Sequence, residues 1–102
     1  MSDTAFVRFI RTARQGRHWT IAELARRAGL TQPELSRVES GNRMPTLRHV
    51  KGLAEAFSAY PQDDSLEPSD YHRWWSKLGE LAELARIEVR ASGKRQTKPD
   101  EQ

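Results

Sequence analysis

The chain has 102 residues, of which 36% are hydrophobic, and this predicts one compact domain with a small core and an appendage. The formal net charge is +3, but residues 1–57 hold 10 Lys or Arg against 5 Asp or Glu, and this basic front half suits a polyanionic partner. There is no cysteine, no apolar run of bilayer length and no uncharged apolar segment of a secretory signal, so we expect no disulfide, no thiolate metal site, no membrane partner and a cytoplasmic location.

The first helix is expected near the N-terminus. Phe6, Ile10 and Ala13 are spaced four and three residues apart, which places them in one apolar stripe of a helix. Gly16 is expected to end or loosen this helix, because glycine disfavours helix interiors. No segment of the chain shows the alternation of a strand, so the expected fold class is all-α.

The second helix is expected over about residues 20–28. Thr20 stands at its start and Glu23 follows three residues later, which is the spacing of a capping box. In a capping box each side chain accepts a hydrogen bond from the other residue's backbone N–H. Gly29 follows the helix and can adopt the left-handed conformation that ends it.

The third helix, expected over about residues 31–40, repeats this arrangement. Thr31 is its N-cap, Glu34 stands three residues later, and a glycine follows its end. Two such boxes with one glycine between them predict a helix-turn-helix. Pro33 falls in the first turn, where backbone N–H groups have no acceptor within the helix, so it costs no hydrogen bond. A fourth helix is expected after Thr46.

The third helix has two different faces. Leu35 and Val38, three residues apart, form its buried face. Four side chains near its N-terminal end then point outward: Gln32, Pro33, Ser36 and Arg37. Glutamine can pair with adenine, arginine with guanine and serine with several acceptors, while a proline ring can meet a thymine methyl group. This face therefore indicates base reading in the major groove of DNA, and the alternative is a solvated helix surface.

Residues 6–57 resemble the lambda-repressor/Cro-like family of helix-turn-helix regulators, also called XRE-type. The match rests on the core A-x-x-A-G-L-T-Q-P-x-L-S-R-V-E-S-G, which is followed directly by N-R-M-P-T. The resemblance implies a five-helix DNA-binding domain, usually dimeric on a pseudo-palindromic operator, whose third helix reads bases. It also implies three positions that hold phosphates: Thr31, Asn42 and Arg43.

One position departs from the family pattern. Many members have a glutamine directly after the threonine that opens the second helix, where it binds phosphate, and this sequence has Ile21. Isoleucine offers no hydrogen bond for that purpose. We expect Arg17, Thr20 or Arg43 to compensate as phosphate ligands.

The resemblance also implies an ion pair within the scaffold. In similar proteins an arginine late in the first helix pairs with a glutamate that ends the recognition helix, and Arg14 and Glu39 occupy these positions. A partly buried pair would stabilise the fold rather than contact DNA, since removing one partner leaves a buried charge. The alternative is that both residues are solvated surface charges.

The chain changes character after its first domain. That domain is expected to span residues 1–62, and residues 63–68 form an acidic connector that contains proline. Ser69 is then expected to cap a long helix over residues 69–92. Residues 93–102 contain no core-forming side chain, so this tail is expected to be disordered.

The long helix carries an apolar stripe at heptad spacing. Its members are Tyr71, Trp74, Trp75, Leu78, Leu81, Ala82 and Ala85. Such a stripe must be buried, and we expect it to be the interface of a homodimer that sets two recognition helices one DNA turn apart. Two alternatives are that the helix folds back over its own domain, or that its tryptophans anchor a partner protein.

Other chemistries are not favoured. His18, His49 and His72 have no ligand partner at metal-site spacing, so we expect surface or capping roles and neither metal nor cofactor. No phosphate loop or nucleophile–base pair is present, so an enzyme is not expected. The sequence predicts a sequence-specific DNA-binding transcriptional regulator, a homodimeric repressor on double-stranded DNA that is nucleoid-associated when bound. The alternative is an antitoxin-like interaction module whose aromatic C-terminal helix binds a partner protein.

Overall fold

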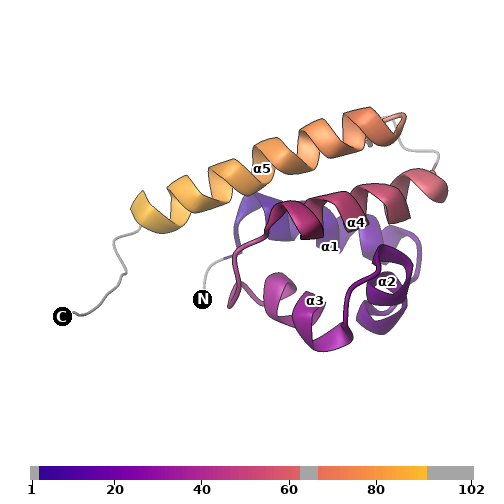
Figure 1. Ribbon diagram of the computed structural model, residues 1–102, viewed down its shortest axis with the longest axis horizontal. Coiled ribbons are helices and arrows are strands. Elements are labelled where there is room, and N and C mark those ends of the chain that lie inside the picture. The colour runs from indigo at the N-terminus through magenta and orange to yellow at the C-terminus, as the bar shows by residue number, and fades with distance from the viewer. Residues whose placement is uncertain (1–2, 63–66, 92–102) are drawn as a thin grey trace.

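A computed structural model describes residues 3–62 and 67–91 of the chain (Figure 1). The described residues form five α-helices and contain no strand. The helices are Ala5–Gly16 (α1), Ile21–Ala28 (α2), Gln32–Glu39 (α3), Leu47–Ala59 (α4) and Tyr71–Ala91 (α5). The predicted all-α class is therefore confirmed, and α5 is the fifth helix. Most of the expected connector and the whole expected tail at 93–102 lie outside the described residues.

The helices are arranged in layers. Figure 1 shows α5 lying along one side of α1 and α4, while α2 and α3 lie on the other side. The two short helices of the helix-turn-helix are thus held at the far side of the molecule from α5. The C-terminal end of α5 extends past the first turn of α4 (Figure 1).

A single apolar core joins all five helices. Its fully buried large side chains include Phe6, Ile10, Leu24, Leu35, Val38, Leu53, Phe57, Trp74 and Leu78. Trp74 of α5 is the link between the two parts of the chain, because its ring lies 4.8 Å from that of Phe57 and 5.7 Å from that of Phe9. The predicted boundary at residue 62 therefore does not separate two independently packed units.

The predicted dimer interface on α5 is wrong. Five of its seven residues are buried inside the chain itself, namely Trp74, Leu78, Leu81, Ala82 and Ala85. The other two, Tyr71 and Trp75, are partly buried and pack against the same core. The helix folds back over its own domain, because burial against α1 and α4 removes the stripe from water without the entropy cost of association.

One helix end agrees with its prediction and another differs. α1 ends at Gly16, as predicted, and the turn after it places His18 in the left-handed region with φ of 58°. This conformation costs a residue other than glycine roughly 1–2 kcal/mol. α5 begins after Asp70 instead of Ser69, since the Asp70 Oδ1 atom accepts a hydrogen bond from the Arg73 backbone N–H at 2.9 Å.

A close helix contact positions α2. A Cβ atom at Gly52 of α4 would overlap the backbone carbonyl oxygen of Ala28. Only glycine leaves room for this approach, so the last turn of α2 is fixed directly against α4.

Candidate nucleic-acid interface

The turn between α2 and α3 is built from local hydrogen bonds. Gly29 adopts the predicted left-handed conformation with φ of 71°, and the Leu30 N–H donates to a carbonyl in the last turn of α2 at 2.8 Å. At the start of α3, Thr31 Oγ1 accepts from the Glu34 N–H at 3.2 Å, and Glu34 Oε1 accepts from the Thr31 N–H at 3.4 Å. The predicted capping box is confirmed, and Pro33 lies in the first turn as predicted.

The predicted capping box of α2 is only half formed. Thr20 Oγ1 accepts from the Glu23 N–H at 3.0 Å, but the Glu23 carboxylate binds Arg27 Nη2 at 2.9 Å. Arg27 stands one turn further along the same helix, so it competes with the backbone for this carboxylate. Ile21, the residue that departs from the family pattern, packs against the core.

α3 presents the two predicted faces. Leu35 and Val38 are fully buried beneath the helix. All four predicted base-reading residues are exposed, namely Gln32, Pro33, Ser36 and Arg37. Their outward placement is confirmed, and their contact with bases stays a prediction.

A buried carboxylate fixes the N-terminal end of α3, and it was not recognised in the sequence. Glu34 is buried, and its Oε2 atom lies 2.8 Å from His49 Nε2 and also binds the Arg48 guanidinium. The hydrogen bond from His49 and the charge of Arg48 outweigh the cost of burial and lower the Glu34 pKa to about 2. Glu34 therefore stays charged and ties the recognition helix to α4.

His49 completes this connection. The backbone N–H of Thr46 donates to His49 Nδ1 at 2.9 Å, so Nδ1 is the acceptor and Nε2 carries the proton that is donated to Glu34. His49 thus caps α4, in agreement with one of its two predicted roles, but it is fully buried and not at the surface. The spacing of Thr46 and His49 equals that of Thr31 and Glu34, and this pattern could have indicated the cap.

A second buried carboxylate fixes the C-terminal end of α3. Glu39, with 4% of its side chain exposed, receives Arg14 Nε on Oε2 at 2.7 Å and Arg14 Nη2 on Oε1 at 3.0 Å. Arg14 also donates to the Trp19 carbonyl oxygen at 2.9 Å. The predicted ion pair is confirmed as a contact that joins α1 to the end of α3, and the alternative of two solvated charges is wrong.

Four of the predicted phosphate ligands are exposed, at the N-caps of α2 and α3 and in the loop after α3. They are Thr20, Thr31, Asn42 and Arg43. The loop after α3 is ordered by Asn42, whose backbone N–H donates to the Arg37 carbonyl oxygen at 2.9 Å and whose Nδ2 donates to Ser40 Oγ at 3.1 Å. Asn42 and Arg43 therefore lie in an ordered loop that directly follows the C-terminal end of α3.

The prediction that Arg17 binds phosphate is wrong. Only 4% of its side chain is exposed, and its two Nη atoms bind the Glu67 carboxylate at 2.8 and 2.9 Å. Its guanidinium also lies over the Phe57 ring, with its central carbon 4.9 Å from the ring centroid. Arg17 therefore anchors the segment that leads into α5, and it is unavailable to DNA because its charge is already neutralised inside the protein.

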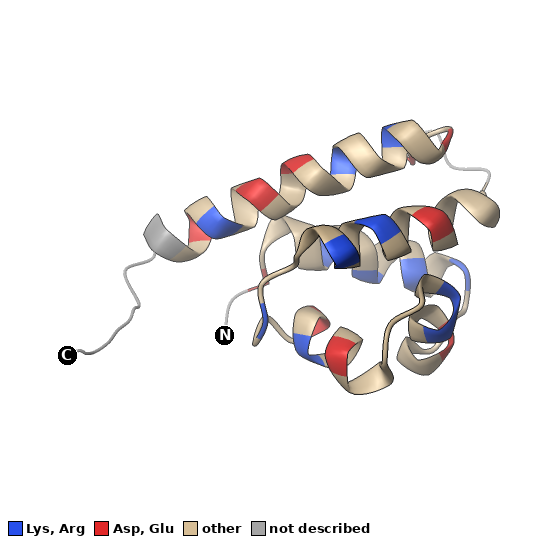
Figure 2. Ribbon diagram, viewed as in Figure 1, with Lys and Arg blue, Asp and Glu red and all other residues tan. Residues whose placement is uncertain are grey.

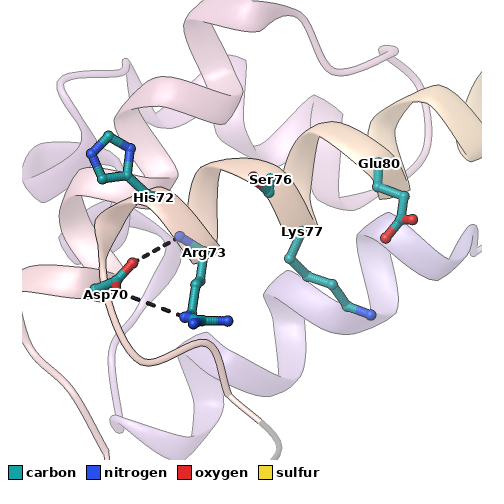
Figure 3. Close-up of a pocket in the computed structure, with 6 residues that line it drawn as sticks. All are labelled: Asp70, His72, Arg73, Ser76, Lys77 and Glu80. Carbon is teal, nitrogen blue, oxygen red and sulfur yellow. Dashed lines mark hydrogen bonds and ion pairs between the residues drawn. The ribbon is translucent and has the colours of Figure 1, made fainter.

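The outer face of α5 is a second surface on which charged residues gather. Figure 2 shows basic residues near the start of α5 and both acidic and basic residues further along it, whereas the first turns of α4 are basic. A shallow hollow of about 590 Å³ runs along the outer face of α5, and all six of its lining residues come from this helix or the residue before it (Figure 3). Asp70 there pairs with Arg73, and the side chains do not converge on one point (Figure 3). This hollow is a solvated helix face.

None of the five helices of the described residues is long and apolar enough to cross a membrane. Within residues 3–62 and 67–91, no group of three or more His, Cys, Asp or Glu side chains could hold a metal ion. The candidate interface is α3 with its exposed outward residues.

Comparison with known proteins identifies the class. Residues 10–62 match a family model described as helix-turn-helix, and this chain belongs to that family, as its resemblance to XRE-type regulators predicted. Among its relatives are two proteins named as uncharacterized HTH-type transcriptional regulators, from Mycobacterium tuberculosis strains CDC 1551 / Oshkosh and ATCC 25618 / H37Rv. Each is 36% identical over 67 residues, which cover 61% of this chain and 48% of the relative. The chain thus spans about half the length of these relatives, and no solved structure gives a significant match.

Proposed function

We propose that the chain is a sequence-specific DNA-binding transcriptional regulator that places α3 in the major groove. The observation that carries this proposal is the exposed polar face of α3, on a helix held at both ends by the buried carboxylates Glu34 and Glu39. A rigid scaffold matters because base reading requires side chains at fixed positions. Membership of the helix-turn-helix family and the names of the relatives support the same function.

The proposed contacts divide into two groups. Gln32, Pro33, Ser36 and Arg37 read base edges, and Thr20, Thr31, Asn42 and Arg43 hold phosphates. Base contacts carry the sequence preference, whereas phosphate contacts set the position of the protein on the duplex. The excess of positive charge in residues 1–57 draws the protein to DNA by releasing counterions.

We further propose that two copies act together as a repressor on a pseudo-palindromic operator. α3 has only eight residues and can reach few base pairs, so one copy alone offers little discrimination. Two recognition helices related by a two-fold axis would double the number of bases read. The pairing surface is not the aromatic stripe of α5, because that stripe lies in the core.

The alternative function, an interaction module that binds a partner protein through the aromatic stripe of α5, is not favoured. Trp74 is buried and Trp75 packs against the core, so neither is presented as an anchor for another protein. The sequence feature that supported this alternative is therefore used within the fold.

Selection of bound duplexes from a random pool tests the proposed function. We expect the full chain to recover a defined half-site at near-physiological salt. Arg37→Ala should weaken binding to that site by about 10–100-fold, the equivalent of roughly 1–3 kcal/mol for one bidentate base contact. Arg73→Ala, which removes an exposed arginine of α5 on the other side of the molecule, is the matched control and should change affinity little.

The salt dependence separates the two groups of contacts. Arg43→Ala should weaken binding to all sequences alike and reduce the slope of log K against log salt by about 1. Arg37→Ala should instead relax the preference at one base position. If the wild-type chain recovers no common sequence from the pool, the proposed function is wrong.

A further inference from the structure

The most exposed large apolar side chain of the described residues lies beside a groove. Leu47, the first residue of α4, is 72% exposed. Next to it, a groove of about 280 Å³ runs between the start of α4 and the middle of α5. We call it the Leu47 groove, and its lining includes Leu47, Val50, Gly79, Ala82, Glu83 and Arg86.

The groove is large enough for a leucine side chain. A cavity of roughly 150 Å³ in a protein interior can hold a benzene molecule, and the Leu47 groove is larger. Gly79 makes this room, because a Cβ atom there would meet nothing within 4 Å. Arg86 closes one end, where its Nη2 atom donates to the Pro45 carbonyl oxygen at 3.2 Å. Val50 and Ala82 provide an apolar lining.

The same surface carries both an exposed leucine, Leu47, and a groove that can receive a leucine side chain. It also holds both signs of charge, because Glu83 and Arg86 both line the groove, are both exposed, and lie 3.7 Å apart. A surface with these features is complementary to itself, which is the requirement for an interface with two-fold symmetry. The matching occupant is therefore a second copy of this chain.

The start of α4 connects the groove to the recognition helix along the chain. α4 follows α3 after one short loop, so Leu47 lies close in the chain to the end of the recognition helix. On this side α5 extends past the first turn of α4, which offers further surface to a second copy (Figure 1).

We propose that two copies of this chain pair through the Leu47 groove, each inserting its Leu47 beside the Gly79 of the other. The interface rests on the proposed homodimeric function and names the surface that serves it. A stable dimer uses about 20–30 residues on each side, and the Leu47 groove with its rim is much smaller. Pairing is therefore weak in free solution and becomes strong when two copies occupy neighbouring half-sites, which raises their effective concentration.

Two substitutions test the groove in opposite ways. Leu47→Asp places a charge on the projecting side chain, and because Leu47 is exposed the fold should be retained. Gly79→Leu fills the groove from its own chain, and because it replaces a helical glycine at a site with free space, it should raise the thermal midpoint while it prevents pairing. Leu84→Asp is the matched control, since Leu84 is an exposed leucine of α5 (44%) outside the groove.

Sedimentation equilibrium of the full chain up to millimolar concentration measures pairing without DNA. We expect weak, reversible dimers for the wild type and Leu84→Asp, and monomers for Leu47→Asp and Gly79→Leu. The same four proteins are then titrated onto duplexes with one or two copies of the half-site recovered by selection. The wild type and Leu84→Asp should bind the duplex with two half-sites at least tenfold more tightly than two independent sites would allow. Leu47→Asp and Gly79→Leu should lose this cooperativity and keep their affinity for the duplex with one half-site.

The outcomes are distinct. Dimers that persist in both groove variants, or a loss of pairing in Leu84→Asp of the same size, would overturn the proposed surface. A wild type that stays monomeric at millimolar concentration and also binds two half-sites independently would overturn pairing itself. If pairing follows the expected pattern but no half-site is recovered from the pool, the proposed DNA-binding function fails while the interface stands.

Discussion

The ion pair between Arg14 and Glu39 allows the strongest prediction about stability. Arg14 binds both carboxylate oxygens of Glu39, and only 4% of the Glu39 side chain is exposed. In Arg14→Ala the carboxylate keeps only Arg11 as a cation, with its Nε atom 3.9 Å away. Leaving a buried charge in this state costs about 3–5 kcal/mol. Such a loss is a large fraction of the roughly 5–15 kcal/mol that holds a domain folded.

Urea unfolding and thermal unfolding, each followed by circular dichroism, measure this effect. The expected loss corresponds to a fall in the thermal midpoint of roughly 12 °C or more, at about 4 °C or more per kcal/mol for a domain of this size. Arg73→Ala is the control, because its partner Asp70 is exposed and such pairs contribute about 0–1 kcal/mol.

The double variant Arg14→Ala, Glu39→Ala completes the test. It leaves no unpaired buried charge, so it should lose clearly less than the sum of the two single variants. Single losses below about 1 kcal/mol, or losses that simply add, would show that the two residues behave as solvated charges and would refute the reasoning.

Three further predictions concern other parts of the fold. Gly52→Ala should lower the free energy of unfolding by about 1–3 kcal/mol in urea titrations, because its Cβ overlaps the Ala28 carbonyl oxygen, and an unchanged midpoint would contradict the close contact. His18→Gly should raise that free energy by about 0.5–1 kcal/mol, because relief of roughly 1–2 kcal/mol of strain exceeds the extra backbone entropy that glycine loses on folding, and a loss would show that the side chain of His18 contributes to stability. The lowered pKa of Glu34 means that the unfolded chain binds its proton more readily than the folded chain, so its stabilisation is present above its ordinary pKa of 4.5 and is lost as the pH falls from 4.5 to about 2. The stability difference between the wild type and Glu34→Gln should shrink over this range, whereas a difference independent of pH would exclude the proposed charge of Glu34.

Short-range patterns predicted the helix-turn-helix well. Thr31, Glu34 and Gly29 make their defining hydrogen bonds with residues at most four positions away, so the sequence alone carries the whole interaction. The same reasoning was incomplete for Glu23, where an arginine one turn away offers the carboxylate a stronger partner than the backbone. For α5 the predicted N-cap was one residue too early. Asp70 is as good a cap as Ser69, and the periodic pattern of apolar residues cannot choose between them.

Long-range contacts decided which charged residues are buried and what they bind. Arg17 and Glu67 are 50 positions apart, and Glu34 and His49 are 15 positions apart. In a sequence each of these residues resembles a surface charge, because burial depends on which elements pack over it. Arg17 was therefore predicted as a phosphate ligand, and the support that Glu34 and His49 give to α3 was not recognised. Only the pair of Arg14 and Glu39 was predicted, through the resemblance to a known family.

The apolar stripe on α5 illustrates the difference between what the sequence determines and what only the tertiary structure decides. Heptad spacing determines that one face of a helix is apolar and must leave water, and Trp74 and Leu78 are buried as this requires. Spacing does not determine which surface covers that face, since a second copy and the same chain remove equal apolar area from water. The tertiary structure decides in favour of α1 and α4, because a face already tethered to its own domain is buried without the loss of translational freedom that a separate partner would have to overcome.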